Sequence, residues 1–592
     1  MRFLMLRALH GWALALACFA PSVYAAPTAA ELPSGGRVTS GQASIAVDGA
    51  HMEVNQASQN ASLDWQTFNV GRNAEVEFHQ PDASAVAVNR IADVNGSRIL
   101  GRVDANGQVY LINPNGVLFG RNAQVDVGGL VASTLDIADA DAASNKRSFS
   151  ISPLPRGEGP GVRASGDEAA VVNQGTITTS DGGYVALLGG RVSNQGVIQA
   201  RLGTVALAAG DKVTLDFAGD KLLGVQVDKG ALRALAENRQ LIQADGGSVL
   251  LTAKAADGLI QTVVNNEGVI EAHSIEDHSG VIKLLGDMDH GTVKVAGTLD
   301  ASAGAGKNTD GGLIDTSAAR VHVAAGAHVT AAARRGATGT WRIDAGNYTI
   351  AAEGGDIDGA TLSASLAGSN VEIRSTAGNG DVSVDDAVAW SANTLTLTAA
   401  RHIHVNQRMT AAGSSTLVMN TGVPNAGVKL GFALGGGFAG RIDFGSRSGK
   451  GLLFIDGESY TVIDSLGTAG STTGADLQGI NGALGNKYAL GADIDAGGLV
   501  GLLGHNSTLL NGYVGSDQGF TVSGTGYVGG LVGGSMGAVS NAYVLHGLLS
   551  NAQPGYADAV GGLAGFNSGT ISHSYGADVD SHGLADYAPR RP

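Results

Sequence analysis

Two pairs of side chains have the types and spacing that could bind a metal ion. In His402-Ile403-His404, the alternation of a strand would place both imidazoles on one face, where they could contact a transition metal or haem. Asp493-Ile494-Asp495 would present two carboxylates in the same way, which suits calcium. Because neither pair has a third ligand nearby in sequence, we interpret the histidines as an exposed strand face and the aspartates as a solvated turn edge. No metal site is predicted.

Residue types used in catalysis are scattered rather than grouped. His273, His278 and His290 lie among acidic residues without ligand spacing, and a chain this rich in Ser and Asp gives no ground for assigning a Ser-His-Asp triad. The glycine-rich runs 435–440 and 445–450 lack the features of a nucleotide-binding loop. We therefore predict no catalytic residue, no cofactor and no enzymatic activity.

The composition indicates a chain with many tight turns and few aromatic residues. The 592 residues include 91 Gly and 12 Pro, and aromatic residues make up 5%. Frequent tight turns are the natural use of so much Gly. The net charge of -16 argues against nucleic acid or an anionic membrane as a partner.

Short strands of Val, Ile and Leu recur along the chain and are closed by Gly, Asn or Asp. The corner motif appears as Asn173-Gln174-Gly175, Asn194-Gln195-Gly196 and Asn266-Glu267-Gly268. This repetition predicts an all-β fold, a right-handed parallel β-helix (solenoid) with coils of about 20 residues. We expect each corner Asn to be structural, with its side chain bonded to the turn backbone and to the Asn of the next coil.

Asn113-Pro114-Asn115-Gly116 is a tight turn between two apolar runs, 107–112 and 117–120. Pro in the second place presets φ, and Asn and Gly tolerate the corner that follows. Any β protein could contain such a turn.

An ordered series of motifs precedes this turn: Asp64-Trp65-Gln66-Thr67-Phe68-Asn69-Val70-Gly71, Val76-Glu77-Phe78-His79-Gln80-Pro81, Asn89-Arg90-Ile91, and the run 96–107. Together they resemble the amino-terminal secretion domain of the filamentous haemagglutinin family, the exoproteins of bacterial two-partner secretion, over about Gly35 to Ile137. The resemblance implies that Asn113, Pro114, Asn115 and Gly116, with Asn89 and Arg90, form a secretion motif. It also implies an outer-membrane transporter as partner, and a location outside a Gram-negative cell, secreted or at its surface.

The first residues have the pattern of a signal peptide. Arg2 and Arg7 precede an apolar segment, and small residues before Ala25 predict cleavage between Ala25 and Ala26. The apolar segment is too short for a stable membrane anchor, so we do not expect an integral membrane protein. Cys18 is the one cysteine. A chain cleaved after Ala25 therefore has neither disulfides nor thiol chemistry.

Four regions follow from these patterns: a signal peptide at 1–25, a secretion domain at 26–290 with an insertion near 148–165, a β-helix repeat region at 291–480, and a repeat region at 481–592. The last region contains Gly-Gly-Leu units that start at Gly497, Gly529 and Gly561, 32 residues apart. They resemble the Gly-Leu-x-Gly repeats of large bacterial surface exoproteins. The repeats reach almost to Pro592 without a visible capping coil, an ending that fits a truncated form of a longer exoprotein.

Three functions are compatible with this organisation. The leading hypothesis is an adhesin that contacts a host cell surface, glycan or protein. A second is a haem-acquisition exoprotein that binds a host haem carrier through an exposed loop, for which 152–163 is the candidate. A third is a polysaccharide-degrading β-helix enzyme, which the scarcity of aromatic residues disfavours.

Overall fold

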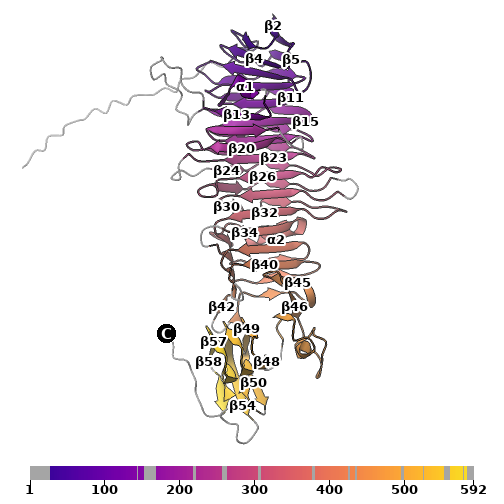
Figure 1. Cartoon of the computed structure of the whole chain (residues 1–592), viewed down its shortest axis with the longest axis vertical. Helices are drawn as coiled ribbons and strands as arrows, with labels where there is room; N and C mark the ends of the chain where they lie inside the picture. The colour runs from indigo at the N-terminus through magenta and orange to yellow at the C-terminus, as the bar shows by residue number, and fades with distance from the viewer. Residues whose placement is uncertain are drawn as a thin grey trace, which may run out of the picture.

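The computed structural model describes residues 27–142, 144–151, 169–217, 222–256, 263–304, 309–376, 380–423, 427–433, 437–494, 499–524, 526–551, 560–577 and 579–582. The predicted signal peptide with its cleavage pair Ala25 and Ala26, and the loop 152–163, lie outside these residues. The described chain is a long rod of stacked coils, with the carboxy-terminal repeats beyond the last coil (Figure 1). The prediction of an all-β parallel β-helix is confirmed.

A coil of the rod contains three strands, one for each side. In one coil these are β16 (Arg191–Asn194), β17 (Val197–Gln199) and β18 (Thr204–Ala209), and the next coil contributes β21 (Leu235–Asn238), β22 (Leu241–Gln243) and β23 (Ser248–Ala253). Each strand pairs in parallel with its counterpart. We call the three sides the first, second and third, in that order.

The first side continues through eight strands: β7 (Ser97–Ile99), β10 (Val117–Phe119), β14 (Ala170–Asn173), β16, β21, β24 (Val263–Asn266), β27 (Thr292–Val295) and β30 (Arg320–Val323). The second side includes β3 (His51–Gln56), β5 (Glu75–His79), β8 (Arg102–Ala105), β25 (Val269–Glu271), β28 (Thr298–Asp300) and β31 (His328–Thr330). The third includes β4 (Asn60–Trp65), β6 (Val86–Ile91), β9 (Gln108–Ile112), β26 (Val281–Leu285), β29 (Leu313–Ser317) and β32 (Thr340–Ala345). The long strands β11 (Gln124–Ser133) and β15 (Thr176–Gly189) pass from the second side to the third.

Strand alternation places the apolar side chains inside the rod. Val192, Ile198 and Val205 are buried, and their neighbours above and below belong to the same core, which extends from Met52 to Val462. A single coil could not enclose these side chains, so stacking is what removes them from water.

The predicted coil length of about 20 residues is correct for some coils and wrong for others. Corner asparagines of neighbouring coils are 21 residues apart at Asn173 and Asn194, 44 apart at Asn194 and Asn238, and 28 apart at Asn238 and Asn266. The longest of these three coils carries an extra hairpin, β19 (Lys212–Asp216) and β20 (Gly224–Lys229). Insertions at the corners lengthen a coil without changing the register of its strands.

This hairpin belongs to a small antiparallel sheet that covers the third side. Its order is β12 (Asp136–Ile137), β13 (Lys146–Ser150), β19 and β20. Phe149 and Val213 from this sheet pack with Tyr110 and Ala186 of the rod in a second core. Residues 148–150 of the predicted insertion are therefore strand residues of β13 that pair with β19.

The amino-terminal end of the rod is antiparallel. β1 (Arg37–Ser40) pairs with β4, and β2 (Ala43–Asp48) pairs with β3, both in antiparallel register. On its other side β3 pairs with β5, and this pairing is parallel, as in the rest of the rod.

Later coils add a sheet of β33 (Tyr348–Ile350), β35 (Val382–Val384), β38 (Ile403–Val405) and β41 (Val428–Leu430). A helix, α2 (Gly359–Gly368), begins at Asp358, whose carboxylate accepts from the Thr361 N–H at 2.7 Å. A short helix, α1 (Asp139–Ala142), lies beside the antiparallel sheet. The rod's last strands are β45 (Gly449–Ile455), β46 (Glu458–Ile463) and β47 (Lys487–Leu490).

The carboxy-terminal repeats form their own stack. One parallel sheet contains β48 (Val500–Leu503), β52 (Val532–Ser535) and β56 (Ala564–Asn567). A second contains β50 (Tyr513–Gly524), β54 (Tyr543–Asn551) and β58 (Tyr575–Ala577), with Tyr513, Tyr543 and Tyr575 paired in register. Leu531, Val532 and Val544 belong to a core separate from that of the rod. Each predicted unit is therefore one coil. Among the described residues, no helix is long and apolar enough to cross a membrane.

Candidate functional site

The Asn113 turn is tied to two neighbouring segments of chain. The Gly116 N–H donates to the Asn113 carbonyl at 2.9 Å, which closes the turn, and the Asn115 N–H donates to Asn113 Oδ1 at 2.9 Å. Asn113 Nδ2 donates to the Asn95 carbonyl at 3.1 Å and to Ser97 Oγ at 3.0 Å. The Asn113 side chain is fully buried. One amide therefore fixes both the turn and its contact with the preceding coil.

The other turn residues divide into exposed and packed positions. Pro114 is exposed, whereas Asn115 Nδ2 donates to the Asp93 carbonyl at 2.8 Å. Gly116 has a φ of +109°, and a Cβ on it would lie 2.8 Å from the Ala170 carbonyl oxygen on the next coil. Glycine is required here by both conformation and space.

Asn89 lies within a strand, β6, on the third side of the rod. Its Oδ1 accepts from Trp65 Nε1 at 2.9 Å, and its Nδ2 donates to the carbonyls of Ala87 and Tyr110 at 3.2 Å each. Asn89 is fully buried. The two sequence motifs that contain Trp65 and Asn89 are therefore joined in the fold by a hydrogen bond between these side chains.

Arg90 faces outward and holds the antiparallel sheet against the rod. Its Nε donates to Asp136 at 3.1 Å, and its Nη2 contacts Asp139 at 2.7 Å and the Ile137 carbonyl at 2.6 Å. Partial burial disfavours the charge of Arg90, but the hydrogen bonds to Asp139 and Asp136 outweigh it and raise the pKa of Arg90. Burial likewise acts against the Asp139 charge, yet Arg90 and Ser62 lower the pKa of Asp139.

The secretion motif predicted from the sequence is thus two sites. Asn113 to Gly116 joins coils on the first side of the rod, and Asn89 with Arg90 joins β6 to Trp65 and to the antiparallel sheet. The two groups are connected through β9, because Arg90 pairs with Ile112, the residue that precedes Asn113. The partners of these residues, above all Asp136 and Asp139, could not be found from the sequence because they depend on the path of the chain over the third side.

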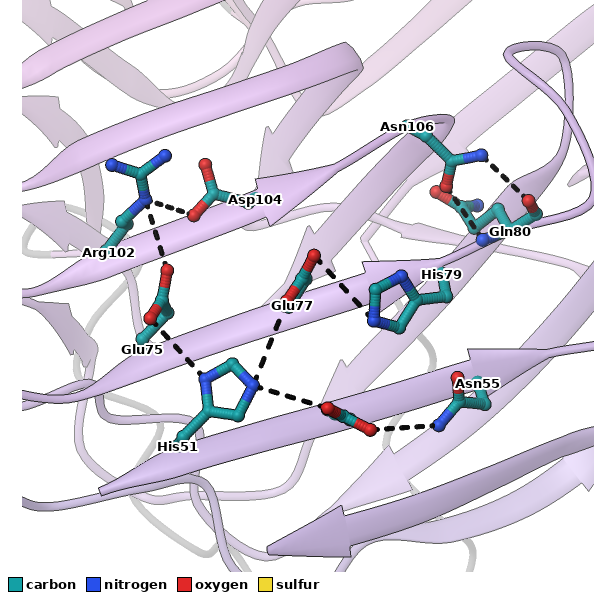
Figure 2. Close-up of polar contacts among 10 residues, drawn as sticks. His51, Asn55, Glu75, Glu77, His79, Gln80, Arg102, Asp104 and Asn106 are labelled. Carbon is teal, nitrogen blue, oxygen red and sulfur yellow. Dashed lines mark hydrogen bonds and ion pairs between the residues drawn. The ribbon is translucent and has the colours of Figure 1, made fainter. Parts of the chain in front are cut away.

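The outer face of β3, β5 and β8 carries alternating acids and bases (Figure 2). His51 lies 3.4 Å from Glu75 and 3.8 Å from Glu77, and Arg102 lies 3.2 Å from Glu75. Further pairs on this face are His51 with Glu53, His79 with Glu77, and Arg102 with Asp104. Exposed ion pairs of this kind each stabilise by about 0–1 kcal/mol. The face is electrically mixed, without a patch of one sign.

The corner asparagines form the predicted ladder. Asn173 Nδ2 donates to Asn194 Oδ1 at 2.8 Å, Asn194 to Asn238 at 2.8 Å, and Asn238 to Asn266 at 2.9 Å. All four side chains are fully buried. Asn238 was not identified from the sequence because its corner, Asn238-Arg239-Gln240, lacks the glycine of the other three.

His404 lies on the outer face of β38 and His402 directly precedes this strand; both side chains are partly exposed, where the sequence predicted an exposed strand face. The structure adds a third side chain. Asp381 comes from the preceding coil, and its oxygens lie 3.6 Å from His402 Nδ1 and 3.9 Å from His404 Nε2. Arg401 donates hydrogen bonds to both oxygens of Asp381 and holds the pKa of that carboxyl at about 2. Sequence spacing did not indicate Asp381, which is 21 residues away from His402 and becomes adjacent only through coil register.

His273 also lies between acids of neighbouring coils. Its Nδ1 is 2.7 Å from Asp245 and its Nε2 is 3.4 Å from Asp300. Hydrogen bonds to Asp245 and Asp300 raise the pKa of His273 to about 10. Of the predicted acidic pair, Asp493 lies 3.3 Å from Arg441, and Asp495 lies outside the described residues.

Comparisons with known proteins identify the amino-terminal part of the chain. Residues 29–301 match the family model described as the TPS (two-partner secretion) secretion domain. Two curated relatives, each called "Heme/hemopexin-binding protein" and both from Haemophilus influenzae, are 34% identical over 261 residues and 32% identical over 246 residues. These segments are 44% and 40% of this chain, but the chain spans 28% and 26% of the length of the relatives. A solved structure, the HMW1 secretion domain from Haemophilus influenzae, has a TM-score of 0.49 and 22% identity, covering 72% of this chain and 98% of that one.

Proposed function

We propose that an outer-membrane transporter receives residues 29–301 while they are unfolded. These residues are the secretion domain of a two-partner secretion exoprotein. Proteins with this domain are secreted across the outer membrane of Gram-negative bacteria. The Asn113 turn and the Asn89 to Arg90 segment are the parts of the domain that we assign to this step.

The observation that favours contact with the unfolded domain is the burial of Asn113. Its amide is enclosed by Asn95, Ser97 and the Asn115 backbone, and it has no exposed surface. A partner can therefore contact this side chain only before the coils stack. Parallel strand pairing between distant segments is slow, which leaves time for such contact in the periplasm.

Export of a turn variant tests this assignment. In a strain with the cognate transporter, we expect N113A combined with N115A to leave the protein in the periplasm or degraded, because the segment no longer presents its amides. The measurement is the ratio of protein in the medium to protein in the periplasm, by immunoblot.

Asn173→Ala is the matched control, since Asn173 is also a fully buried corner asparagine but lies beyond the turn. We expect it to be exported. Normal export of the turn variant would refute the assignment, and equal loss of export in the control would show that a folding defect alone explains the result. Circular dichroism of both purified variants reports whether the coils still form.

For the exported rod we propose the role of a surface adhesin that contacts a host cell, glycan or protein. The support is the shape of the molecule: a long stack of coils, and a further stack of repeats at the carboxy-terminal end (Figure 1). Such a rod places a binding surface far from the cell that secretes it. Adhesion of the purified protein to host cells is the direct measurement.

Binding of a haem carrier is the second candidate, and the names of the two curated relatives favour it. The shared segment is 28% or less of their length, so the binding region of those proteins need not lie within it. Comparing the binding of the purified protein to haem-loaded hemopexin, to apo-hemopexin and to host cells separates the two candidates. Release of unsaturated oligosaccharide from acidic polysaccharides would contradict both and revive the enzymatic alternative.

A further inference from the structure

We propose that Asp381, His402 and His404 form a binding site for a divalent transition-metal ion, such as Zn²⁺, Ni²⁺ or Co²⁺, on the outer face of β35 and β38. The site lies beyond the matched residues 29–301 and is separate from the export function.

The fold places the three side chains together through strand alternation and coil register. On β38, Ile403 and Val405 are buried in the core, so His402 and His404 both point outward. Val382 on β35 pairs with Ile403, which sets Asp381 beside His402. The donors are therefore held by two paired strands of a rigid stack.

The distances suit a small ion. The possible ligand atoms of the three residues all lie within 4.8 Å of one another, with the closest histidine-to-carboxylate approaches at 3.6 Å and 3.9 Å. Ligands about 2.0–2.2 Å from a tetrahedral zinc ion are separated from one another by roughly 3.3 Å. Small side-chain rotations would bring these donors to that separation.

The donor set selects the class of ion. Two imidazoles and one carboxylate favour Zn²⁺, Co²⁺, Ni²⁺ and Cu²⁺ over Ca²⁺ or Mg²⁺, which prefer oxygen ligands. Three protein ligands leave at least one coordination position for water or a group from another molecule. Within the part of the chain that the structure describes, this is the one group of His, Cys, Asp or Glu residues that meets the distance condition. The mixed face of Figure 2, although it also has two histidines, does not.

Arg401 acts on Asp381 and is compatible with an ion. It donates to both carboxylate oxygens, and the His402 N–H also donates to Oδ1 at 3.1 Å. A carboxylate has about four acceptor positions, so the oxygens retain free lone pairs. Partners of this kind orient a ligating carboxylate.

Lys429 is an opposing charge. It occupies the position on β41 that pairs with His404, so its side chain is on the same outer face as the histidines. Its ammonium should weaken the affinity for a cation, which gives the proposal a prediction that a purely structural cluster would not make. Arg401, Lys429 and the open outer face also argue against haem, because a porphyrin ring needs an enclosed apolar surface.

The test is Co²⁺ and Zn²⁺ binding by the full secreted chain, followed by isothermal titration and by the visible absorption of bound Co²⁺. We expect H404N and D381N each to remove one site, and K429Q to tighten binding about two- to fivefold, since it removes one like charge near the ion. H328N, at an exposed histidine on β31, is the control and should leave the number of sites unchanged.

Equal binding by wild type and H404N would overturn the proposal, as would a K429Q variant that binds more weakly. Haemin binding that H404N abolishes, while Co²⁺ binding persists, would also overturn it and assign the pair to haem. Far-ultraviolet circular dichroism of each variant confirms that the coils remain folded.

Discussion

Asparagine is the residue that closes the corners of this fold. Its side chain offers one acceptor and two donor hydrogens, enough to bond its own turn and the next coil at once. Asn113 bonds Asn95 and Ser97 in this way, and Asn194 bonds Gly196 and Asn238. The same chemistry therefore serves the secretion motif and the plain coils, so burial alone does not distinguish them and an export assay is needed.

A second requirement at the turn concerns Gly116. We expect Gly116→Ala to destabilise the coils around it by about 2–3 kcal/mol, because alanine is strained at this φ and its Cβ would crowd the Ala170 carbonyl. Gly49→Ala is the matched control: its φ is +60°, but nothing lies within 4 Å of the added Cβ. That variant should lose about 1 kcal/mol. Hydrogen exchange measures the two losses, in peptides from β9 and β10 for Gly116→Ala and in peptides from β2 and β3 for Gly49→Ala, and equal losses would contradict the crowding argument.

At the scale of elements, neighbouring coils are joined by contacts between stacked polar side chains. His273 follows β25 and contacts Asp245 after β22 and Asp300 at the end of β28, so one imidazole connects three coils. Burial opposes the charge of Asp300, but hydrogen bonds from His273 and Ser302 lower its pKa to about 2. The group therefore carries a protonated histidine between two carboxylates at neutral pH.

This stack makes stability depend on pH. Because the pKa of His273 is raised from 6.5 to about 10 in the fold, its contribution is complete below about pH 6.5 and is lost as the pH rises toward 10. We expect His273→Asn to lower the free energy of unfolding by about 2 kcal/mol at pH 6 and by much less at pH 9.5. Urea unfolding followed by circular dichroism at the two pH values measures this.

His278→Asn is the control for this prediction. His278 is on the same coil, and its side chain is 55% exposed beside Asp277. We expect little change at either pH. A His273 variant whose loss of stability is the same at pH 6 and pH 9.5 would show that the imidazole acts through packing rather than charge.

Local patterns predicted the elements well and the contacts between them poorly. The Asn-x-Gly corners and the turn at Asn113 were recognisable because turn chemistry depends on adjacent residues. Asp381 beside His402, and Asp136 beside Arg90, were not recognisable because coil lengths vary with insertions such as the β19 to β20 hairpin. Asn238 was missed for a different, local reason: Arg239 and Gln240 stand where the other corners have their usual residues.

At the scale of the whole molecule, the chain has separate cores for the rod and for the carboxy-terminal repeats. From the 32-residue spacing of the Gly-Gly-Leu units, the sequence predicted a repeat region at 481–592 but no core of its own. It did not predict the second core of the secretion domain, in which Phe149 packs on Tyr110, because the strands of the covering sheet lie far apart in sequence.

Separate cores should unfold separately. We expect Leu531→Ala to destabilise the carboxy-terminal repeats by about 2–5 kcal/mol, since Leu531 is buried in their core, and to leave the unfolding of the rod unchanged. Leu284→Ala, in the core of the rod, is the reciprocal variant. Hydrogen exchange resolved by region measures both. If either variant destabilised both regions equally, the two cores would be one cooperative unit.

The antiparallel strands at the amino-terminal end have a consequence for the direction in which the rod can grow. β1 and the β2 to β3 hairpin occupy the edges of the first coil, where another parallel strand would otherwise add. Each later coil instead presents open strand edges to the segment that follows it in sequence. The antiparallel cap thus favours the addition of parallel coils at the other end of the stack, so the rod can be completed in the order of its sequence.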